Sequence, residues 1–544
     1  LPPGALLAAP GFEESGGGVA EDVAHRLLDV NQVPAGWLAD QWLQPFVPFE
    51  CAVDKAVFHS GAASVRLSSA DLGAKIGLYS QQQLGSGRYR VSLWARCQPG
   101  GKALLRISLG KGWLSLREVG DQWTECLWTG IVDKPHELEI RAEVRTTLTY
   151  WIDDVSLEPA PQVVLRYVRD SRPNPPKTLL FSPITLADLT ADAQKWADRG
   201  LGGFLLDRVM HDWSSNVWAA DNDPATVGAA DATFQALRAC NQVCAQYGIH
   251  NFIKVAFYSK LPLWTDETGW AQAAENFRQC AIMARDTLCQ GIALDTEYVA
   301  EQYDPRWDGY TYQGYTEEDL HRAARLRGKQ IVEAMLSEFP EMEFLTLPEG
   351  IMYYGPFYED LFRGMLAAVV ERNAPGGLHL MTESTYSMTD YEALLEVPDS
   401  LRVLITWGQP EEIARYWDQR CSVVLGAWPL GYYREIRDEE GNFVGYGGRE
   451  DIFGDEVIGS YADRGPRFAV GEFRQQMAGV SAACTRYNWM YSHGAVWWPT
   501  PGQLEVEGKP PREVEQARAR RAVPNLHEYY AVVRDHYLLE ASAP

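Results

Sequence analysis

The segment GIALDTEYV, residues 291–299, places two carboxylates at the end of an apolar run. Successive side chains of a β-strand point to opposite faces, so Asp295 and Glu297 would leave the same face, roughly 7 Å apart. Two carboxyl groups at this spacing can share acid and base roles in catalysis, or they can belong to a salt-bridged strand end. This segment alone leaves both interpretations open.

Composition limits the class of partner. Lys and Arg number 49 against 73 Asp and Glu, which gives a formal net charge of −24. Such a surface repels phosphate backbones and anionic headgroups, so we expect neither nucleic acid nor a membrane surface as partner. A neutral substrate fits better. The 19 Trp and 26 Tyr can stack on the apolar faces of sugars, although rings also fill large cores.

The cysteines and the start of the chain give information about the cellular compartment in which the protein acts. The nine Cys form no CxxC pair and show no zinc-like spacing with His, and their odd number argues against a dense disulfide framework. No run of about 18 apolar residues predicts a membrane helix. The chain begins at Leu1 without a basic n-region, so we expect a processed protein that acts outside the cell or in the periplasm. The sequence does not indicate an oligomeric state.

Periodicity divides the chain into regions. Residues 10–159 hold short alternating runs, such as GRYRVSLWARC and TYWIDDVSLEP, which predict an all-β sandwich. Residues 160–177 are rich in proline and predict a linker. Residues 511–544 predict a closing helical segment.

Residues 178–510 alternate short apolar strands with amphipathic helical stretches, which predicts a (β/α)8 TIM barrel. The strand candidates are TLLFSPI, GGFLLDRV, NFIKVAFY, GIALDTEYV, EFLTLPEG, LHLMTEST, CSVVLGAWP and GAVWWPTP. A further candidate, LRVLITWG at 401–408, leaves the strand count open by one. The predicted fold class is therefore multidomain, with a β-sandwich followed by a TIM barrel.

The active site of such a barrel lies at the C-terminal ends of its strands. The acids at those ends are the candidate catalytic residues: Asp207, Asp295, Glu297, Glu349 and Glu383. Three of the polar residues at these strand ends also have a purely structural interpretation. Asp207 could pair with Arg208, Lys254 could neutralise a nearby acid, and Glu349 could cap a turn.

Aromatic residues accompany these acids. The loop YVAEQYDPRWDGYTYQGY, residues 298–315, carries six rings in a segment whose Pro and Gly prevent one continuous helix. Rings on such loops are typical of a sugar groove. The candidate substrate-binding residues are Tyr298, Trp307, Tyr353, Tyr386, Trp428, Trp497 and Trp498. No Walker-A, GxGxxG, GxSxG or HExxH motif competes with this interpretation.

Residues 11–159 resemble the carbohydrate-binding modules of the family 4/9/22 jelly-roll group. The resemblance is carried in order by GFEES, PAGW at 34–37, HSGAASVRLSS at 59–69, YRVSLWARC at 89–97 and YWIDDVSL at 150–157. It implies a jelly-roll sandwich and, because many such modules hold a structural Ca²⁺, makes Glu13 and Asp154 candidate calcium ligands. A solvated Glu and an Asp turn are the alternative.

QGIALDTEYV resembles the DGxDxDxE motif on the fourth strand of glycoside hydrolase family 18, the chitinase type. The resemblance implies that Glu297 protonates the glycosidic oxygen and that Asp295 orients the substrate's N-acetyl group. GAVWWPTPG is similar to the Trp-bearing last strand of that family. The matching residues are Gly291, Ile292, Asp295, Glu297 and Tyr298, and the departures are Gln290, Ala293 and Thr296. The resemblance therefore supports the barrel and Glu297 more than it supports chitin.

The favoured function is a secreted glycoside hydrolase that cleaves a poly- or oligosaccharide without a cofactor. Glu297 is the expected general acid, and a second carboxylate, best Glu383 with Asp207 or Glu349 behind it, is the nucleophile or base. The alternatives are a substrate-assisted hydrolase of an N-acetylated glycan and a non-catalytic polysaccharide-binding protein. A metal-dependent lyase or deacetylase is disfavoured because the ten His show no paired spacing at strand ends.

Overall fold

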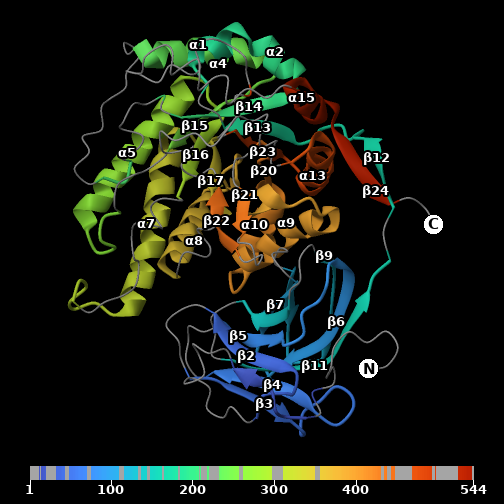
Figure 1. The fold of residues 1–544 in the computed structure, drawn as a ribbon. Helices are drawn as coiled ribbons and strands as arrows, with labels where there is room; N and C mark the ends of the chain where they lie inside the picture. Colours follow the sequence, from blue (N-terminus) through green and yellow to red (C-terminus); the bar gives the residue numbers. More distant parts are fainter. Residues whose placement is uncertain are drawn as a thin grey trace. The chain divides into compact units, whose positions relative to one another are not determined.

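A computed structural model describes most of the chain. The described residues are 12, 14–19, 32–42, 48–69, 75–109, 115–132, 137–143, 148–161, 164–181, 184–207, 209, 217–219, 232–255, 261–296, 310–349, 356–430, 434–437, 443–447, 468–492, 497 and 525–541. The chain divides into two compact units (Figure 1). The sandwich unit comprises Leu1–Arg166, Asp390–Trp407 and Glu540–Pro544, and the barrel unit comprises Tyr167–Thr389 and Gly408–Leu539.

Two sheets form the sandwich unit. The six-stranded sheet has the order β1 (Gly18–Val19), β2 (Trp37–Trp42), β5 (Lys75–Ser80), β10 (Leu138–Ala142), β7 (Ala103–Leu109) and β8 (Ser115–Val119). The five-stranded sheet has the order β3 (Glu50–Asp54), β4 (Ser64–Ser69), β11 (Leu148–Pro159), β6 (Gly87–Cys97) and β9 (Thr124–Val132). All pairs in both sheets are antiparallel except β1 with β2.

The alternation of residue types builds this sandwich. In β6, Val91, Leu93 and Ala95 are buried, whereas Trp94 and Arg96 between and after them are only partly buried. Because side chains alternate along a strand, the first set fills the core between the sheets and the second lies on the outer face. The predicted β-sandwich is confirmed.

Helix α9 (Tyr391–Thr406) also belongs to the sandwich unit, where it packs on β8 and β9. The Asp390 side chain caps it and accepts a hydrogen bond from the Ile131 backbone N–H at 3.1 Å. Residues 401–406 of the candidate strand LRVLITWG lie in this helix, so that interpretation is wrong. Leu394, Val397 and Leu401 are buried at helical spacing, and the apolar run is one face of a helix.

The barrel unit is built on a parallel sheet that returns to itself. Its order is β19 (Ser422–Val424), β18 (Leu378–Met381), β17 (Glu343–Leu347), β16 (Gly291–Asp295), β15 (Phe252–Val255), β14 (Leu201–Leu206), β13 (Lys177–Phe181), β23 (Tyr487–Tyr491) and β20 (Gly426–Ala427). Only Leu425 separates β19 from β20, so these are two halves of one strand, one paired with β18 and the other with β23. The predicted TIM barrel is confirmed, and the ring has eight strands.

The eighth strand is β23, and its predicted position at GAVWWPTP is wrong. The sequence YNWMY puts Tyr487, Trp489 and Tyr491 on one face of β23, and the first two belong to the cluster that fills the barrel. Of residues 494–501, only Trp497 lies in the described part of the chain. Each strand contributes an inward side chain to that core, such as Leu179, Phe252 and Ala293.

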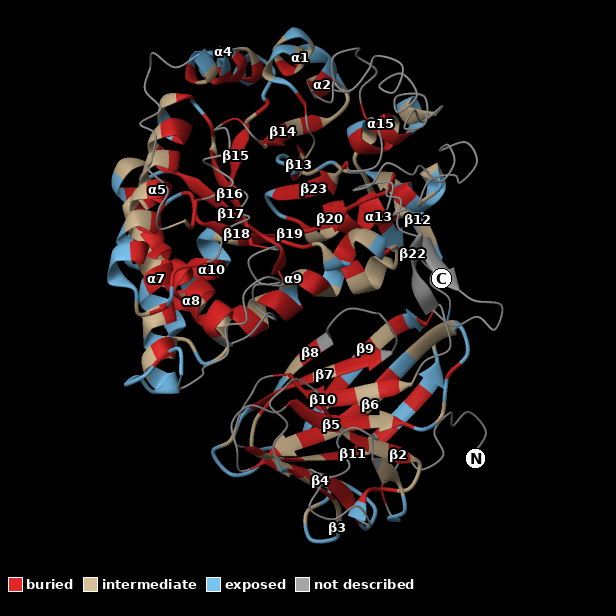
Figure 2. Cartoon of the chain, turned by 60° about the vertical axis from the view of Figure 1, so that its left-hand side comes forward, coloured by how far each residue is buried: buried red, intermediate tan, exposed pale blue. Residues whose placement is uncertain are grey.

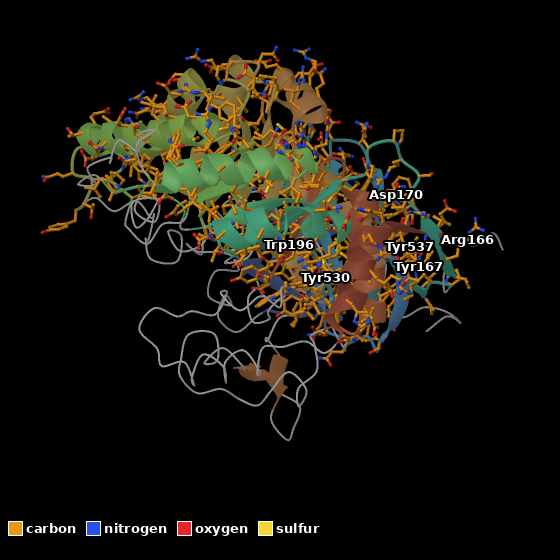
Figure 3. All side chains as sticks on the ribbon, turned by 90° about the horizontal axis from the view of Figure 1, so that it is seen from above. Arg166, Tyr167, Asp170, Trp196, Tyr530 and Tyr537 are labelled. Atoms are coloured by element: carbon orange, nitrogen blue, oxygen red, sulfur yellow. The ribbon has the colours of Figure 1, made fainter. Side chains whose placement is uncertain are left out.

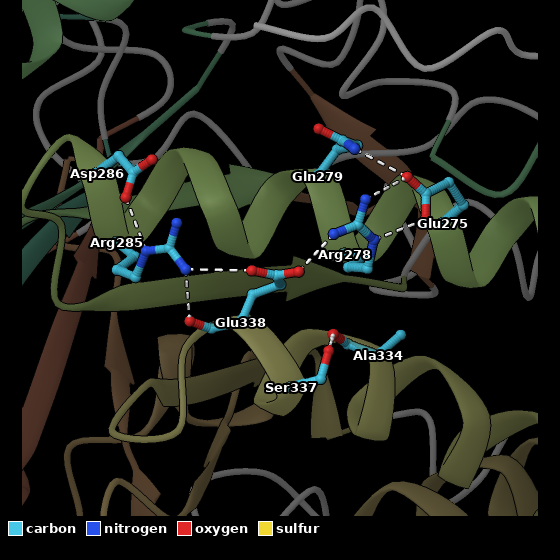
Figure 4. Close-up of polar contacts among 8 residues, drawn as sticks. All are labelled: Glu275, Arg278, Gln279, Arg285, Asp286, Ala334, Ser337 and Glu338. Atoms are coloured by element: carbon cyan, nitrogen blue, oxygen red, sulfur yellow. Dashed lines mark hydrogen bonds and ion pairs between the residues drawn. The ribbon is translucent and has the colours of Figure 1, made fainter. Parts of the chain in front are cut away.

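Helices surround the barrel, with buried residues on one side and exposed residues on the other (Figure 2). They are α1 (Leu186–Ala191), α2 (Ala193–Asp198), α4 (Ala232–Gln246), α5 (Glu267–Asp286), α7 (Glu317–Glu338), α8 (Pro356–Glu371), α10 (Glu411–Arg420), α13 (Val470–Ala483) and α15 (Leu526–Asp535). Ion pairs tie α5 to α7, because Arg278 and Arg285 both pair with Glu338 (Figure 4).

Two small sheets complete the fold. Strand β12 (Leu165–Arg169) pairs with β24 (Tyr537–Ala541), and β21 (Arg434–Arg437) pairs with β22 (Phe443–Gly447). Figure 3 labels Tyr167 and Tyr537, whose ring centroids lie 6.1 Å apart, and Trp196 and Tyr530, whose centroids lie 6.3 Å apart. The region predicted as a linker therefore contributes a strand, and the closing segment contains a helix followed by a strand.

A buried polar network occupies the amino-terminal end of the barrel. Glu343, the first residue of β17, accepts a hydrogen bond from Gln290 at 2.8 Å and pairs with Arg486. The His379 Nε2 lies 2.9 Å from the Gly376 carbonyl oxygen, and its Nδ1 lies 2.9 Å from the Ser422 hydroxyl. A neutral ring that donates from Nε2 and accepts at Nδ1 satisfies both contacts. Burial lowers the pKa of His379 to about 4.

We expect His379→Gln to reduce the pH dependence of stability. Since the folded-state pKa lies below the ordinary value, the unfolded chain binds the extra proton between pH 6.5 and 4. The wild type therefore loses up to about 3 kcal/mol as the pH falls through that window. Urea unfolding at pH 7 and pH 4.5 measures the difference, with exposed His527→Gln as control. An equal loss in the wild type and His379→Gln would contradict the assignment.

Candidate functional site

The carboxyl ends of the parallel strands bring together four of the five predicted acids. Asp207 follows β14 and is half-buried, Asp295 ends β16, Glu349 follows β17 and Glu383 follows β18. In a parallel barrel these ends lie on one side, where the βα loops form the site. Glu297, the fifth acid, lies just beyond β16 and outside the described residues.

Asp295 is half of a buried ion pair. The Lys254 Nζ on the neighbouring strand β15 lies 2.9 Å from Asp295 Oδ2, and the two side chains are only 5% and 7% exposed. Lys254 Nζ also lies 4.6 Å from the centroid of the Phe181 ring, a cation–π contact. The salt-bridge interpretation is thus correct for Asp295, and Lys254 neutralises it.

Glu349 links the end of β17 to the end of β18. Its Oε2 accepts a hydrogen bond from the Glu383 backbone N–H at 2.6 Å, and its Oε1 accepts one from the Ser384 N–H at 2.9 Å. The side chain is buried, and burial raises the pKa of Glu349. With both oxygens bonded to main chain, this carboxyl group fixes the turn that carries Glu383.

Glu383 lies directly before a 3₁₀ turn, η4 (Ser384–Ser387), and the residue is half-buried. The Tyr386 hydroxyl donates to Glu383 Oε1 across a long 3.4 Å contact. The Tyr386 ring lies 5.6 Å from Trp428, 5.4 Å from Trp489 and 5.9 Å from Tyr491, centroid to centroid. Tyr386 therefore joins a candidate catalytic acid to a wall of rings.

A glycine makes this ring cluster possible. A Cβ atom at Gly426 in β20 would lie 2.3 Å from the Thr382 carbonyl oxygen, 2.7 Å from Trp489 Nε1 and 2.9 Å from the Tyr386 ring. The Trp489 Nε1–H donates to that same carbonyl at 3.0 Å. Only a residue without a side chain permits this close approach.

Continuous contacts connect the ion pair with Glu383. Lys254 touches Phe181, and the Phe181 ring stacks on Tyr491 with centroids 5.4 Å apart. Tyr491 in turn stacks on Tyr386, with rings only 12° from parallel. The barrel end therefore holds a charged side at β15 and β16 and an acid at β18, with aromatic rings between them.

The other predicted site residues take different places. Trp428 contacts Tyr386 and Tyr491 but is only 3% exposed. Trp497 is fully buried, with its ring 5.6 Å from Tyr530 of α15, so it presents no surface to a substrate. Five predicted residues, Tyr298, Trp307, Tyr353, Trp498 and Glu13, lie outside the described residues.

Three rings of the site, Phe181, Trp489 and Tyr491, were not among the sequence candidates. The sequence contained a signal for two of them. YNWMY alternates aromatic with non-aromatic residues, as expected of a strand that carries rings on one face. Phe181 gave no such signal, because a single Phe at the end of TLLF is equally typical of a buried strand.

The predicted calcium ligand Asp154 is engaged elsewhere. Its Oδ1 accepts from the Ser60 hydroxyl at 2.6 Å and its Oδ2 lies 2.6 Å from His59 Nδ1. Asp153 beside it is buried and accepts from the His59 and Ser60 backbone N–H groups. Within the described ranges, no group of three or more His, Cys, Asp or Glu could hold a metal ion. Glu13, the other predicted calcium ligand, lies outside the described residues, so the calcium site stays a prediction.

Comparison with known proteins yields likenesses of fold. No protein-family profile and no curated protein matches the sequence. The CBM22-1–GH10 modules of the Clostridium thermocellum endo-1,4-β-D-xylanase 10B, solved with xylohexaose, align over 97% of this chain and 99% of that one, at 10% identity and a TM-score of 0.31. The xylan-binding CBM22-1 domain of Paenibacillus barcinonensis Xyn10C covers 29% of this chain and 97% of its own length, at 13% identity and a TM-score of 0.21.

A third similar structure is TmCBM61 in complex with β-1,4-galactotriose. It covers 29% of this chain and 99% of its own length, at 22% identity and a TM-score of 0.21. With identities below 25% and TM-scores below 0.5, these likenesses by themselves establish neither the fold nor the function of this chain. Separately, none of the helices in the described part of the chain is long and apolar enough to cross a bilayer.

We expect Lys254→Met to cost about 3 to 5 kcal/mol of unfolding free energy, because it leaves the Asp295 carboxylate buried without its partner. Lys254→Met combined with Asp295→Leu should recover most of that loss, since an apolar pair replaces both charges. Urea unfolding of the wild type, both single variants and the double variant gives the coupling energy. If the loss of unfolding free energy in the double variant equals the sum of the losses in the two single variants, the two side chains do not stabilise each other, contrary to the geometry.

Proposed function

We propose that the chain is a glycoside hydrolase whose active site lies at the carboxyl ends of the barrel strands. One observation supports this most. The run of contacts from Asp295 and Lys254 through Phe181, Tyr491 and Tyr386 to Glu383 puts acids on both sides of an aromatic wall. Glycosidic cleavage ordinarily uses two carboxyl groups, and aromatic rings beside them can hold the sugar by stacking on its apolar face.

Glu297 is the proposed general acid. It follows Asp295 by two residues at the end of a strand whose own residues are buried. A carboxyl group held against rings and away from water has a raised pKa and stays protonated near neutral pH, which suits it to protonate the leaving oxygen. Asp295, paired with Lys254, is proposed to orient the substrate.

Glu383 is the proposed second carboxylate, acting as nucleophile or as the base that activates water. Glu349 suits this role less, because both of its oxygens accept hydrogen bonds from the main chain. We propose instead that Glu349 is a positioning residue that fixes the backbone of Glu383. The Tyr386 hydroxyl would then hold the Glu383 carboxyl group towards the substrate.

A substrate-assisted reaction on an N-acetylated glycan is the second candidate. The observation that favours it is the D-x-E order itself, since Asp295 is fixed by Lys254 directly before Glu297. In that route the acetamido oxygen replaces Glu383 as nucleophile, so Glu383→Gln would retain turnover. A polymeric carbohydrate does not cross membranes, and action outside the cell therefore accords with either route.

We expect the wild type to release reducing ends from at least one glycan in a panel that includes xylan, galactan, β-glucans and chitin. Glu297→Gln should reduce that rate by at least about a hundredfold, because it removes the transferable proton. Glu383→Gln should do the same in the two-carboxylate route. Glu341→Gln is the matched control, as this exposed Glu precedes β17 at the opposite end of the barrel.

Circular dichroism of each variant establishes that it is folded before rates are compared. Full activity in a folded Glu297→Gln variant would show that Glu297 is not the general acid. Retention of a glycan by the wild type, with no reducing ends released from any member of the panel, would instead favour the non-catalytic binding protein.

A further inference from the structure

A buried glutamine on helix α13 takes no part in the ion pairs and ring contacts described above. In α13, Phe473, Gln476, Met477 and Val480 are buried at the i, i+3, i+4 and i+7 spacing of one helix face. Three of them are apolar, as expected of a face that packs on a core, yet Gln476 is fully buried among them. Burial of a side-chain amide is unfavourable unless its polar atoms are hydrogen-bonded, so the partners of Gln476 account for its position.

Those partners are main-chain carbonyl groups of the turn that follows Glu383. The Gln476 Nε2 donates to the carbonyl oxygens of Thr385 at 3.1 Å, Tyr386 at 3.2 Å and Met388 at 2.9 Å. Two N–H groups are thus shared among three acceptors. The reverse orientation of the amide would direct Oε1 at three carbonyl oxygens with no proton between them, so the contacts fix which atom faces the turn.

The other atom of the amide makes no such contact. Among the residues that the structure describes, the buried Gln476 Oε1 has no hydrogen-bond partner. The unpaired acceptor costs free energy, which the contacts of Nε2 offset, so the side chain acts through its donors alone. Gln475 extends the same contact, because its Nε2 donates to the Thr389 carbonyl oxygen at 2.9 Å. Two successive side chains of α13 therefore bond the carbonyl groups of this turn.

The turn depends on external partners because η4 is short. Within it, the Tyr386 N–H donates to the Glu383 carbonyl oxygen at 2.9 Å, and the Met388 N–H donates to the Thr385 carbonyl oxygen at 3.0 Å. A single 3₁₀ turn leaves most of its remaining carbonyl groups without partners inside the turn. Gln476 supplies donors to these groups from a helix outside the barrel.

Other residues bond the turn at its start and in its middle. The Glu349 carboxylate accepts hydrogen bonds from the first two N–H groups, as described above. The Thr385 Oγ1 donates to the Gly426 carbonyl oxygen at 2.8 Å and joins the turn to β20. The N–H groups at the start of the turn and the carbonyl groups at its end thus have different partners. The backbone is fixed at both ends.

We propose that Gln476 is a positioning residue, whose side-chain amide fixes the turn that presents Glu383 and Tyr386 at the carboxyl end of the barrel. Because Gln476 is fully buried, it acts through the backbone of the turn and not on the substrate. A displacement of about 1 Å in a reacting group can lower a rate about a hundredfold, so bonds to this backbone affect catalysis. The inference rests on the proposed role of Glu383, and the experiment therefore measures the turn both with and without turnover.

Gln476→Met removes the donors and keeps a side chain of similar length. Hydrogen–deuterium exchange of residues 382–389, followed by mass spectrometry, reports on the turn, and kcat on the glycan that the wild type hydrolyses reports on the site. Asn241→Leu is the matched control. Asn241 is a buried amide on α4 that donates to the Thr287 carbonyl oxygen at 2.8 Å, and Thr287 precedes β16 at the opposite end of the barrel. Thermal unfolding followed by circular dichroism shows that both variants are folded and compares their stabilities.

We expect Gln476→Met to accelerate exchange in residues 382–389 by about tenfold or more, and to lower kcat by a similar factor. Asn241→Leu should leave both quantities unchanged, although it also lowers the melting temperature. Unchanged exchange in a folded Gln476→Met variant would overturn the proposal. So would a normal kcat in a variant whose turn exchanges faster, or equal changes in Asn241→Leu.

Gln476→Glu gives a readout that a loss of packing would not. A carboxyl group buried against three carbonyl oxygens has a raised pKa, and in its protonated form it can still donate to one of them. The ratio of kcat in this variant to kcat in the wild type should therefore fall as the pH rises from about 5 to about 8, whereas the ratio for Gln476→Met stays constant. Glu349 and Glu383 titrate in both proteins, so the ratio removes their contribution. A constant ratio for Gln476→Glu would contradict the proposed contact.

This inference and the glycosidase can fail independently. If the wild type hydrolyses no glycan, the glycosidase is overturned, and faster exchange in Gln476→Met still supports the positioning role, because exchange does not depend on turnover. Hydrolysis by the wild type, with unchanged exchange and unchanged kcat in Gln476→Met, overturns the positioning role and leaves the glycosidase intact.

Discussion

Parallel pairing around a closed ring is the constraint on which the barrel unit depends. The strands β13 to β20 and β23 all run in the same direction, and β19 and β20 complete the ring by pairing with β18 and with β23. One end of the barrel therefore collects every carboxyl terminus, and the loops that leave there supply the candidate site. The other end collects the amino termini and holds the neutral His379 and the Glu343–Arg486 pair.

Each end of the barrel holds a buried acid that is paired with a basic residue, but the surroundings of the two ion pairs differ. Glu343 is paired with Arg486, and Asp295 is paired with Lys254, so neither acid is left alone in a medium that penalises isolated ions. At the amino end the partners close a structural network. At the carboxyl end the rings of Phe181, Tyr491 and Tyr386 connect the pair with Glu383, where the candidate site lies.

The sequence predicted the features that depend on repeated patterns of residue types, and it missed the features that depend on a single contact. Period-two runs and strand–helix alternation depend on many residues, so the sandwich and the barrel followed from them, as did strands β13 to β19. LRVLITWG was mistaken for a strand because a short apolar run has no decisive period, and its helix is set by packing on β8 and β9. The contacts of Lys254 with Asp295, and of Glu349 with the turn at Glu383, join residues far apart in the chain. No local spacing encodes them.

The same ring chemistry is achieved by two different backbones. In the barrel unit, Tyr386 follows β18 whereas Trp489 and Tyr491 both lie on β23, and Tyr386 and Trp489 meet because Gly426 leaves room between them. In the sandwich unit, Trp94 and Trp151 come from adjacent strands of one sheet and are spaced by its register. The barrel end thus brings rings beside acids through the turns that follow its strands, whereas the sandwich sheet places rings beside ion pairs through strand register.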